Sequence, residues 1–271
     1  MSIAAQTEKI PMKTCKYLAL PIVLASALAV TACGGGGPDS TTSSTAATTK
    51  AEGLYSGTGS STTPGLTVTP FQLLILENDE YWWMAGESTP SRLVVEGVEQ
   101  GQGESTNTTF TMTTISDGEP PITAVIMANF VQNVSFNGTV TGPNFSATIS
   151  AFPLDRTIYD YKAAANLAAI VGAWSLTALD GSATTINIAS TGAITGYSGV
   201  CTLTGTIAPR ESGKNVFNTS VTFGPAPCSR AGQTSTGIGL SYPIAGTTTR
   251  QLVIAGVDSG RTATTALYGT R

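Results

Sequence analysis

Short runs of β-branched and aromatic residues recur along the chain from residue 53 onward, and clusters of Gly, Pro, Asn, Asp or Ser separate them. Such runs with polar turns between them are typical of antiparallel strands joined by hairpins. Eight runs lie between residues 53 and 150, and eight more lie between residues 172 and 268. The sequence therefore predicts an all-β chain with two antiparallel domains, each a barrel or a sandwich of about eight strands.

One stretch between the two sets has a different composition, because Tyr161 to Ile170 is rich in alanine. Alanine favours a helix, although so short a segment is marginal in water without tertiary contacts. We therefore expect a short helical linker here. It would join an N-terminal β domain over residues 51–162 to a C-terminal β domain over residues 163–271.

Two runs place apolar residues on both faces of a strand. In the run from Gln251 to Val257 both parities are apolar, which predicts a strand that is covered twice or faces another surface. In YWWM, Tyr81 and Trp83 share one face. Trp82 and Met84 share the other. Because both aromatic faces cannot fill one core, we interpret this strand as a candidate surface for a protein or glycan partner. The alternative is a core strand with one ring covered by a loop.

The N-terminal segment has the order of a secretory signal peptide. Two lysines follow Met12, an apolar run extends from Tyr17 to Val30, and small residues precede Cys33. The apolar run is short for a membrane span, so residues 1–32 are predicted to be a signal peptide, with a short membrane helix as the alternative.

The tetrapeptide VTAC at residues 30–33 resembles the lipobox of bacterial lipoproteins. The resemblance implies that the chain is cut before Cys33, that the Cys33 thiol carries diacylglycerol, and that the new amino terminus can be acylated. Two or more acyl chains are enough for stable anchoring. Gly34 stands where an Asp commonly retains such proteins at the inner membrane of Gram-negative bacteria, so the resemblance implies the outer membrane.

Residues 33–50 are rich in Gly, Ser and Thr and show no apolar period, so they are predicted to be a flexible tether. As a Gaussian coil, this segment would span on the order of 20 to 25 Å. With its tether and β-rich body, the chain resembles β-rich surface or periplasmic lipoproteins of Gram-negative bacteria.

The second set of strands opens with Gly172-Ala173-Trp174, which resembles the Gly-x-Trp opening of lipocalins and related calycin barrels. The resemblance implies that Trp174 plugs one end of a barrel and that Arg261 or Arg271 packs on it. The alternative is an ordinary core tryptophan. The first set opens with the similar GLYS at residues 53–56, so an internal duplication is a further hypothesis.

The cysteines divide according to the predicted export. The lipid would take Cys33, and Cys15 would leave with the signal peptide. Because an exported protein meets an oxidising compartment, we expect Cys201 and Cys228 to form a disulfide. With no histidine in the chain, two cysteines cannot build a usual zinc or haem site, so we expect no metal and no cofactor.

The absence of histidine also excludes Ser-His-Asp and Cys-His catalysis. Three acidic residues remain as candidates, because Glu77, Asp79 and Glu80 could serve a glycoside hydrolase or bind calcium. The alternative interpretation is a hairpin turn at Asn78-Asp79 with solvated acids. We therefore expect no catalytic residues.

The chain has a net charge of −4 and no cluster of Lys or Arg, which argues against a nucleic-acid partner. We expect a non-enzymatic outer-membrane lipoprotein that acts as a binding or structural module and contacts the membrane through the lipid on Cys33. The alternatives are a calycin-like carrier of a small apolar ligand and a carboxylate-dependent hydrolase.

Overall fold

The computed structural model describes residues 49–65, 67–89, 92–116 and 122–271, and the structural statements below concern these residues. The described residues belong to one compact unit. The expected signal peptide, the lipidation site Cys33 and the tether up to residue 48 lie outside the described residues.

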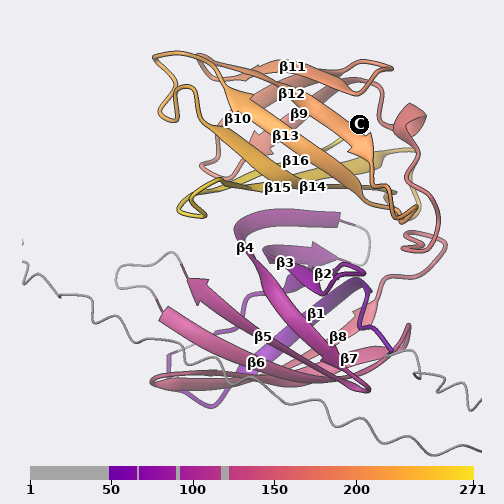
Figure 1. Cartoon of the computed structure of the whole chain (residues 1–271), viewed down its shortest axis with the longest axis vertical. Helices are drawn as coiled ribbons and strands as arrows, with labels where there is room; N and C mark the ends of the chain where they lie inside the picture. The colour runs from indigo at the N-terminus through magenta and orange to yellow at the C-terminus, as the bar shows by residue number, and fades with distance from the viewer. Residues whose placement is uncertain (1–48, 66, 90–91, 117–121) are drawn as a thin grey trace, which may run out of the picture. The chain divides into compact units, whose positions relative to one another are not determined.

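The described chain forms two closed antiparallel barrels, which we name the N-barrel and the C-barrel (Figure 1). In each barrel every strand pairs with the next one along the chain, and the last strand closes on the first. The all-β prediction is confirmed, and the barrel alternative replaces the sandwich. The N-barrel strands are β1 Gly53–Ser61, β2 Phe71–Ile75, β3 Glu80–Thr89, β4 Arg92–Thr106, β5 Thr109–Ser116, β6 Ile122–Val131, β7 Ser135–Gly142 and β8 Phe145–Pro153. The C-barrel strands are β9 Gly172–Ala178, β10 Ala183–Ile188, β11 Ala193–Ser198, β12 Cys201–Pro209, β13 Phe217–Phe223, β14 Thr234–Pro243, β15 Arg250–Asp258 and β16 Thr264–Thr270.

Alternating side chains produce the inner and outer faces of these barrels. In β10, Ile186 and Ile188 are fully buried, whereas Thr185 and Asn187 are exposed. Because successive side chains of a strand point to opposite faces, a meander of such strands buries its apolar set by closing on itself.

Each barrel interior is filled by side chains. The N-barrel encloses a cluster with six fully buried aromatic rings: Tyr55, Phe71, Tyr81, Phe110, Phe130 and Phe136. The C-barrel encloses Trp174, Phe217 and the branched aliphatic residues of its strands, including Ile186, Ile207 and Ile254. Both barrels are therefore packed cores over most of their length.

A third apolar cluster joins the two barrels through their outer faces. From the N-barrel it takes outward side chains of β2, β3 and β4, and from the C-barrel it takes outward side chains of β14, β15 and β16. The principal members are Leu74, Trp82, Met84, Leu93, Val95, Ile238, Leu240, Tyr242, Val253 and Ala255.

The position of strand β15 explains why apolar residues occupy both of its faces. Leu252 and Ile254 belong to the C-barrel core, whereas Val253 and Ala255 belong to the cluster between the barrels. The prediction that this strand is covered on both faces is confirmed.

The segment between the barrels differs from the expected helix. Its one regular element among the described residues is a 3-10 turn, η1 Leu167–Ala169, whose N-terminus is capped by the Asn166 side chain. The helical linker predicted over residues 161–170 is not shown. Alanine propensity alone does not make a helix of a segment this short. Tertiary contacts, such as the burial of Ile170, fix its ends instead.

Within the described part of the chain, no helix has the length and apolar character needed to span a membrane.

Candidate functional site

The aromatic strand β3 lies between two cores instead of facing solvent. Tyr81 and Trp82 are each 1% exposed and Met84 is 0% exposed. Trp82 and Met84 pack against the C-barrel, and the Trp82 indole N–H donates to Glu80 Oε1 at 2.9 Å.

The other face of β3 belongs to the N-barrel core. Tyr81 Oη donates to the Thr113 carbonyl oxygen at 2.6 Å, and the half-buried Trp83 ring stacks on Phe71 with 3.8 Å between ring centroids. The structure therefore corrects the expectation of an open aromatic surface at Tyr81, Trp82, Trp83 and Met84. The two faces of β3 belong to separate clusters, as predicted. The outer face is covered by the C-barrel of the same chain and not by a partner.

The acidic cluster forms the predicted hairpin turn between β2 and β3. The Asp79 N–H donates to the Leu76 carbonyl oxygen at 3.0 Å, and Asp79 has a φ of 64°, which Asp tolerates better than most residues. The Asp79 carboxylate is 6% exposed, pairs with Lys50, and accepts hydrogen bonds from Ser105 Oγ at 2.7 Å and Ser105 N–H at 3.3 Å.

The two neighbouring glutamates point to other partners. Glu80 accepts hydrogen bonds from Trp82 and from Gln100 Nε2, the latter at 3.1 Å. Glu77 pairs with Arg210 of the C-barrel at 2.8 Å and accepts a hydrogen bond from Tyr161 Oη at 3.1 Å. The structure thus brings the three acids to one turn but gives each a separate structural contact.

Burial raises the pKa of the Glu77 carboxyl, but the hydrogen bond and charge of Arg210, with backbone and Tyr161 hydrogen bonds, outweigh it. The net pKa of Glu77 is lowered from its usual value of 4.5, so the group is charged at neutral pH.

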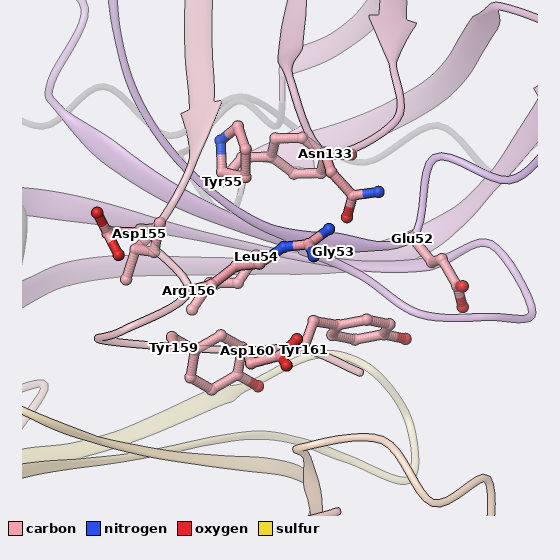
Figure 2. Close-up of a pocket in the computed structure, with 12 residues that line it drawn as sticks. Glu52, Gly53, Leu54, Tyr55, Asn133, Asp155, Arg156, Tyr159, Asp160 and Tyr161 are labelled. Carbon is pink, nitrogen blue, oxygen red and sulfur yellow. The ribbon is translucent and has the colours of Figure 1, made fainter. Parts of the chain in front are cut away.

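A first cavity, of about 370 Å³, lies beside the start of β1 and the segment that leaves β8. Figure 2 shows Tyr55 and Asn133 above this groove and Tyr159 and Tyr161 below it. Burial raises the pKa of all three phenols, and a nearby glutamate adds to the effect at Tyr55 and Tyr161, so all three are neutral hydrogen-bond donors.

These phenols already donate within the protein. Tyr55 Oη donates to the Ala51 carbonyl oxygen at 2.9 Å, and Tyr159 Oη donates to the carbonyl oxygen of Asn215 in the C-barrel. Glu52, on the same groove, pairs with Lys214 at 3.1 Å. Two polar side chains of this groove, Glu52 and Tyr159, therefore contact the C-barrel and help to hold the two barrels together.

A second cavity, of about 540 Å³, opens at the end of the C-barrel where the β9–β10 and β11–β12 turns lie. Its floor includes the buried side chains of Leu203, Val221 and Leu267. A disulfide between Cys201 and Cys228 ties the β13–β14 loop to the start of β12 at its edge, which confirms the predicted bond.

Arg230 is the cationic side chain on the wall of this depression. Its guanidinium lies over the Phe223 ring at 4.6 Å, and its Nη1 donates to the Thr264 carbonyl oxygen at 3.1 Å and to Thr265 Oγ1 at 2.6 Å. Its Nη2 is buried and has no hydrogen-bond partner among the described residues, whereas buried donors normally have one.

Arg230 was not among the residues predicted from the sequence. The available signal was its position two residues after Cys228, in a loop that the disulfide fixes. Two further polar atoms, Gln72 Nε2 and Ser235 Oγ, are also buried with no partner in the described part of the chain, and neither residue lines the two cavities above.

The opposite end of the C-barrel is closed by Trp174 and Arg271. The Arg271 guanidinium lies 4.4 Å from the Trp174 ring and donates to the carbonyl oxygens of Val171 at 2.6 Å and Ala169 at 3.2 Å. An arginine therefore packs on Trp174 as expected from the Gly-x-Trp opening, and it is Arg271. Arg261 instead contacts Gln100 of the N-barrel.

The two barrels begin with the same local arrangement. The Trp174 indole N–H donates to the carbonyl oxygen of Ile170, four residues earlier, at 2.8 Å. Tyr55 Oη donates to Ala51, also four residues earlier, at 2.9 Å. Each aromatic residue follows a glycine with positive φ, Gly172 at 111° and Gly53 at 153°. The shared geometry supports the duplication hypothesis beyond the short sequence match.

Among the described residues, no group of three or more Cys, Asp or Glu side chains is placed to hold a metal ion. In comparisons with known proteins, the chain matches no protein-family model, no curated protein and no solved structure.

Proposed function

We propose that the protein is a non-enzymatic binding module, anchored in the outer membrane through a lipid on Cys33, with its binding site at the end of the C-barrel. The observation that carries this proposal is the Arg230 guanidinium on the wall of a depression that also has apolar side chains. A fixed cation beside apolar surface favours a ligand that has both an anionic and an apolar part.

The chemistry of the depression selects the ligand class. Leu203, Val221 and Leu267 offer apolar contact, and Arg230 offers a fixed cation whose position is set by Phe223. An apolar group that carries a carboxylate, phosphate or sulfate would satisfy both parts of the site. The packed interior below the floor restricts such a ligand to the barrel end.

Anion binding can be tested by titrating the purified protein with sodium decanoate and, as a neutral comparison, with decanol. We expect Arg230→Gln to weaken decanoate binding by at least about tenfold and to leave decanol binding unchanged, because only the carboxylate uses the guanidinium. The matched control is Arg156→Gln, which changes an exposed arginine at the other cavity. Equal decanoate affinity in wild type and Arg230→Gln would remove the proposed site.

The anchor is tested separately by intact-mass analysis of the protein expressed in a Gram-negative host. The proposal predicts a mature chain that begins at Cys33 and carries the mass of a diacylglycerol, with a further acyl chain where the amino terminus is modified. A Cys33→Ala variant should lose both the added mass and membrane attachment.

A calycin-like carrier is the second candidate function. The observation in its favour is that Trp174 and Arg271 close one end of the C-barrel while the depression opens at the other. The packed core argues against a ligand deep inside the barrel. Native mass spectrometry separates the two functions, because a carrier should retain an apolar molecule through purification, whereas a surface site exchanges it. The hydrolase alternative has no specific observation in its favour, since each acid of the turn has a structural partner.

A further inference from the structure

One outer face of the N-barrel carries no charge. The sequence from Ile122 to Leu154, which contains β6, β7 and β8, has no Asp, Glu, Lys or Arg. Seven large apolar side chains of the described residues are exposed, and five of them belong to this stretch. They are Val125 at 39%, Met127 at 62%, Val131 at 57%, Val134 at 58% and Phe152 at 58%. We name the outward side chains of this stretch the open face.

The register of the strands brings these residues to one surface. Val125, Met127 and Val131 occupy alternate outward positions of β6. Ser135 of β7 lies opposite Val131, and Phe152 of β8 follows Ala151, the partner of Phe136. The residues opposite Met127 on the two adjacent strands are the uncharged Thr111 and Thr139. The open face is thus an uncharged surface on which exposed apolar side chains stand among exposed Thr, Ser and Asn side chains.

The chain enters the barrel at one end of this face. Gln132, in the turn between Val131 and Val134, donates from Nε2 to the carbonyl oxygen of Lys50 at 3.4 Å. Lys50 is the last residue of the expected tether to Cys33. A lipid anchor on Cys33 would lie 17 residues before Lys50 in the chain, so it would keep the open face at a high effective concentration near the membrane.

Physical chemistry favours this face over the outer face of β3 and β4 for contact with lipid. Its exposed side chains would leave water on entering the headgroup boundary, and no ion would be desolvated there. Strands β3 and β4 carry the exposed Glu87 and Glu96, whose desolvation would oppose insertion.

We propose that the open face lies on the membrane that anchors the protein, with Val125, Met127, Val131 and Phe152 in the boundary between headgroups and acyl chains. The proposal rests on the proposed lipid anchor. It adds a fixed orientation, in which β6 and β8 face the bilayer and the C-barrel site, whose strands carry no part of the open face, stays available to ligand.

Methionine oxidation provides a probe within the native chain. Met84, Met112 and Met127 are the methionines that follow Cys33, and their exposed fractions are 0%, 1% and 62%. The lipidated protein is reconstituted in phosphatidylcholine vesicles, treated with hydrogen peroxide and analysed by peptide mass spectrometry, beside Cys33→Ala protein in solution. We expect Met127 oxidation to slow by roughly tenfold on vesicles, because peroxide reaches the thioether mainly while the face is lifted away.

Two matched variants and one internal control complete the experiment. Phe152→Asp in the lipidated protein should restore rapid Met127 oxidation, whereas Tyr197→Asp, at an equally exposed position of the C-barrel, should leave the protection intact. Iodination of Tyr197 in the wild type should be the same with and without vesicles.

Two results would overturn the proposal. Unchanged Met127 oxidation in protein whose lipid is confirmed by mass would show that the anchor is present and the face is not docked. Protection of Met127 that appears without vesicles and rises with protein concentration would assign the face to a second copy of the chain. Absence of the lipid itself would contradict the proposed anchor, a different failure that intact mass identifies.

Discussion

The N-barrel has two outer faces that carry large apolar side chains, and these faces differ in what surrounds them. On β2 and β3, Leu74, Trp82 and Met84 are at most 1% exposed because the C-barrel covers them. On the open face, Met127 and Phe152 are 62% and 58% exposed. Ion pairs to the C-barrel, from Glu77 and Glu52, border the covered face, whereas the open face has no charged residue.

This difference separates two kinds of contact. Polar groups that pair across an interface fix one register of one partner, as Gln251 of β15 does by exchanging two hydrogen bonds with the Leu93 backbone of β4. The open face carries no charged side chain, and the lipid contact proposed above requires no such pairing.

The largest expected effect is on the covered face, at Trp82. Trp82→Ala would leave a cavity where the ring packs between the barrels, and we expect the free energy of unfolding to fall by about 3 to 5 kcal/mol. Urea unfolding followed by circular dichroism measures this. A loss below about 1 kcal/mol would mean that the C-barrel does not bury this side chain in solution.

The second effect concerns the polar pairing at Gln251, which is 1% exposed. Gln251→Leu would leave the Leu93 N–H and carbonyl oxygen without partners, so we expect a loss of about 2 to 3 kcal/mol. Gln132→Leu is the matched control on the N-barrel turn, where we expect a change within about 0.5 kcal/mol. Equal effects of the two substitutions in urea unfolding would contradict the assigned contact.

A smaller effect on stability, which depends on pH, is expected at the border of the covered face. The folded-state pKa of Glu77 is lowered, so the Glu77–Arg210 pair contributes stability above the usual carboxyl pKa of 4.5 and loses it as the pH falls below that value. The pair retains solvent contact, so we expect at most about 1 kcal/mol.

The measurement compares wild type with Glu77→Gln by urea unfolding at neutral pH and at about pH 3.5. The stability difference between the two proteins should be present at neutral pH and shrink in acid. A difference that is constant with pH would show that the Glu77 charge has no role in the contact.

The smallest effect is expected on the open face. Met127→Ala and Phe152→Ser remove side chains that make few contacts in the folded chain, so we expect stability in solution to change by no more than about 0.5 kcal/mol. Thermal unfolding in the absence of lipid measures this. A large destabilisation would mean that these side chains are covered, within the chain or by another copy.

Local patterns in the sequence were enough to predict the strands and the existence of two-sided burial. Alternation in β10 and the double apolar parity of β15 both follow from the two-residue period of a strand, which is a local property. The expectation that Arg261 or Arg271 packs on Trp174 came from a three-residue resemblance and not from alternation, and the structure places Arg271 there.

The contacts around the candidate site join residues that are far apart in the sequence, so local patterns could not predict them. Nothing near Trp82 in the sequence indicates that β14 and β15 cover it, and Glu77 meets Arg210 only because the barrels pack. The helix expected over residues 161–170 is not seen, and here too a contact outside the segment matters. The Trp174 indole N–H holds the carbonyl oxygen of Ile170 at the end of the segment.

Oxidation of the native protein in solution tests the central comparison most directly, because Met84 lies on the covered face and Met127 on the open one. Cys33→Ala protein is treated with peroxide under native conditions, and the two sulfoxides are followed by mass spectrometry. The account predicts rapid oxidation of Met127, and oxidation of Met84 only when urea unfolds the protein. Oxidation of Met84 at the rate of Met127 in the folded protein would contradict it.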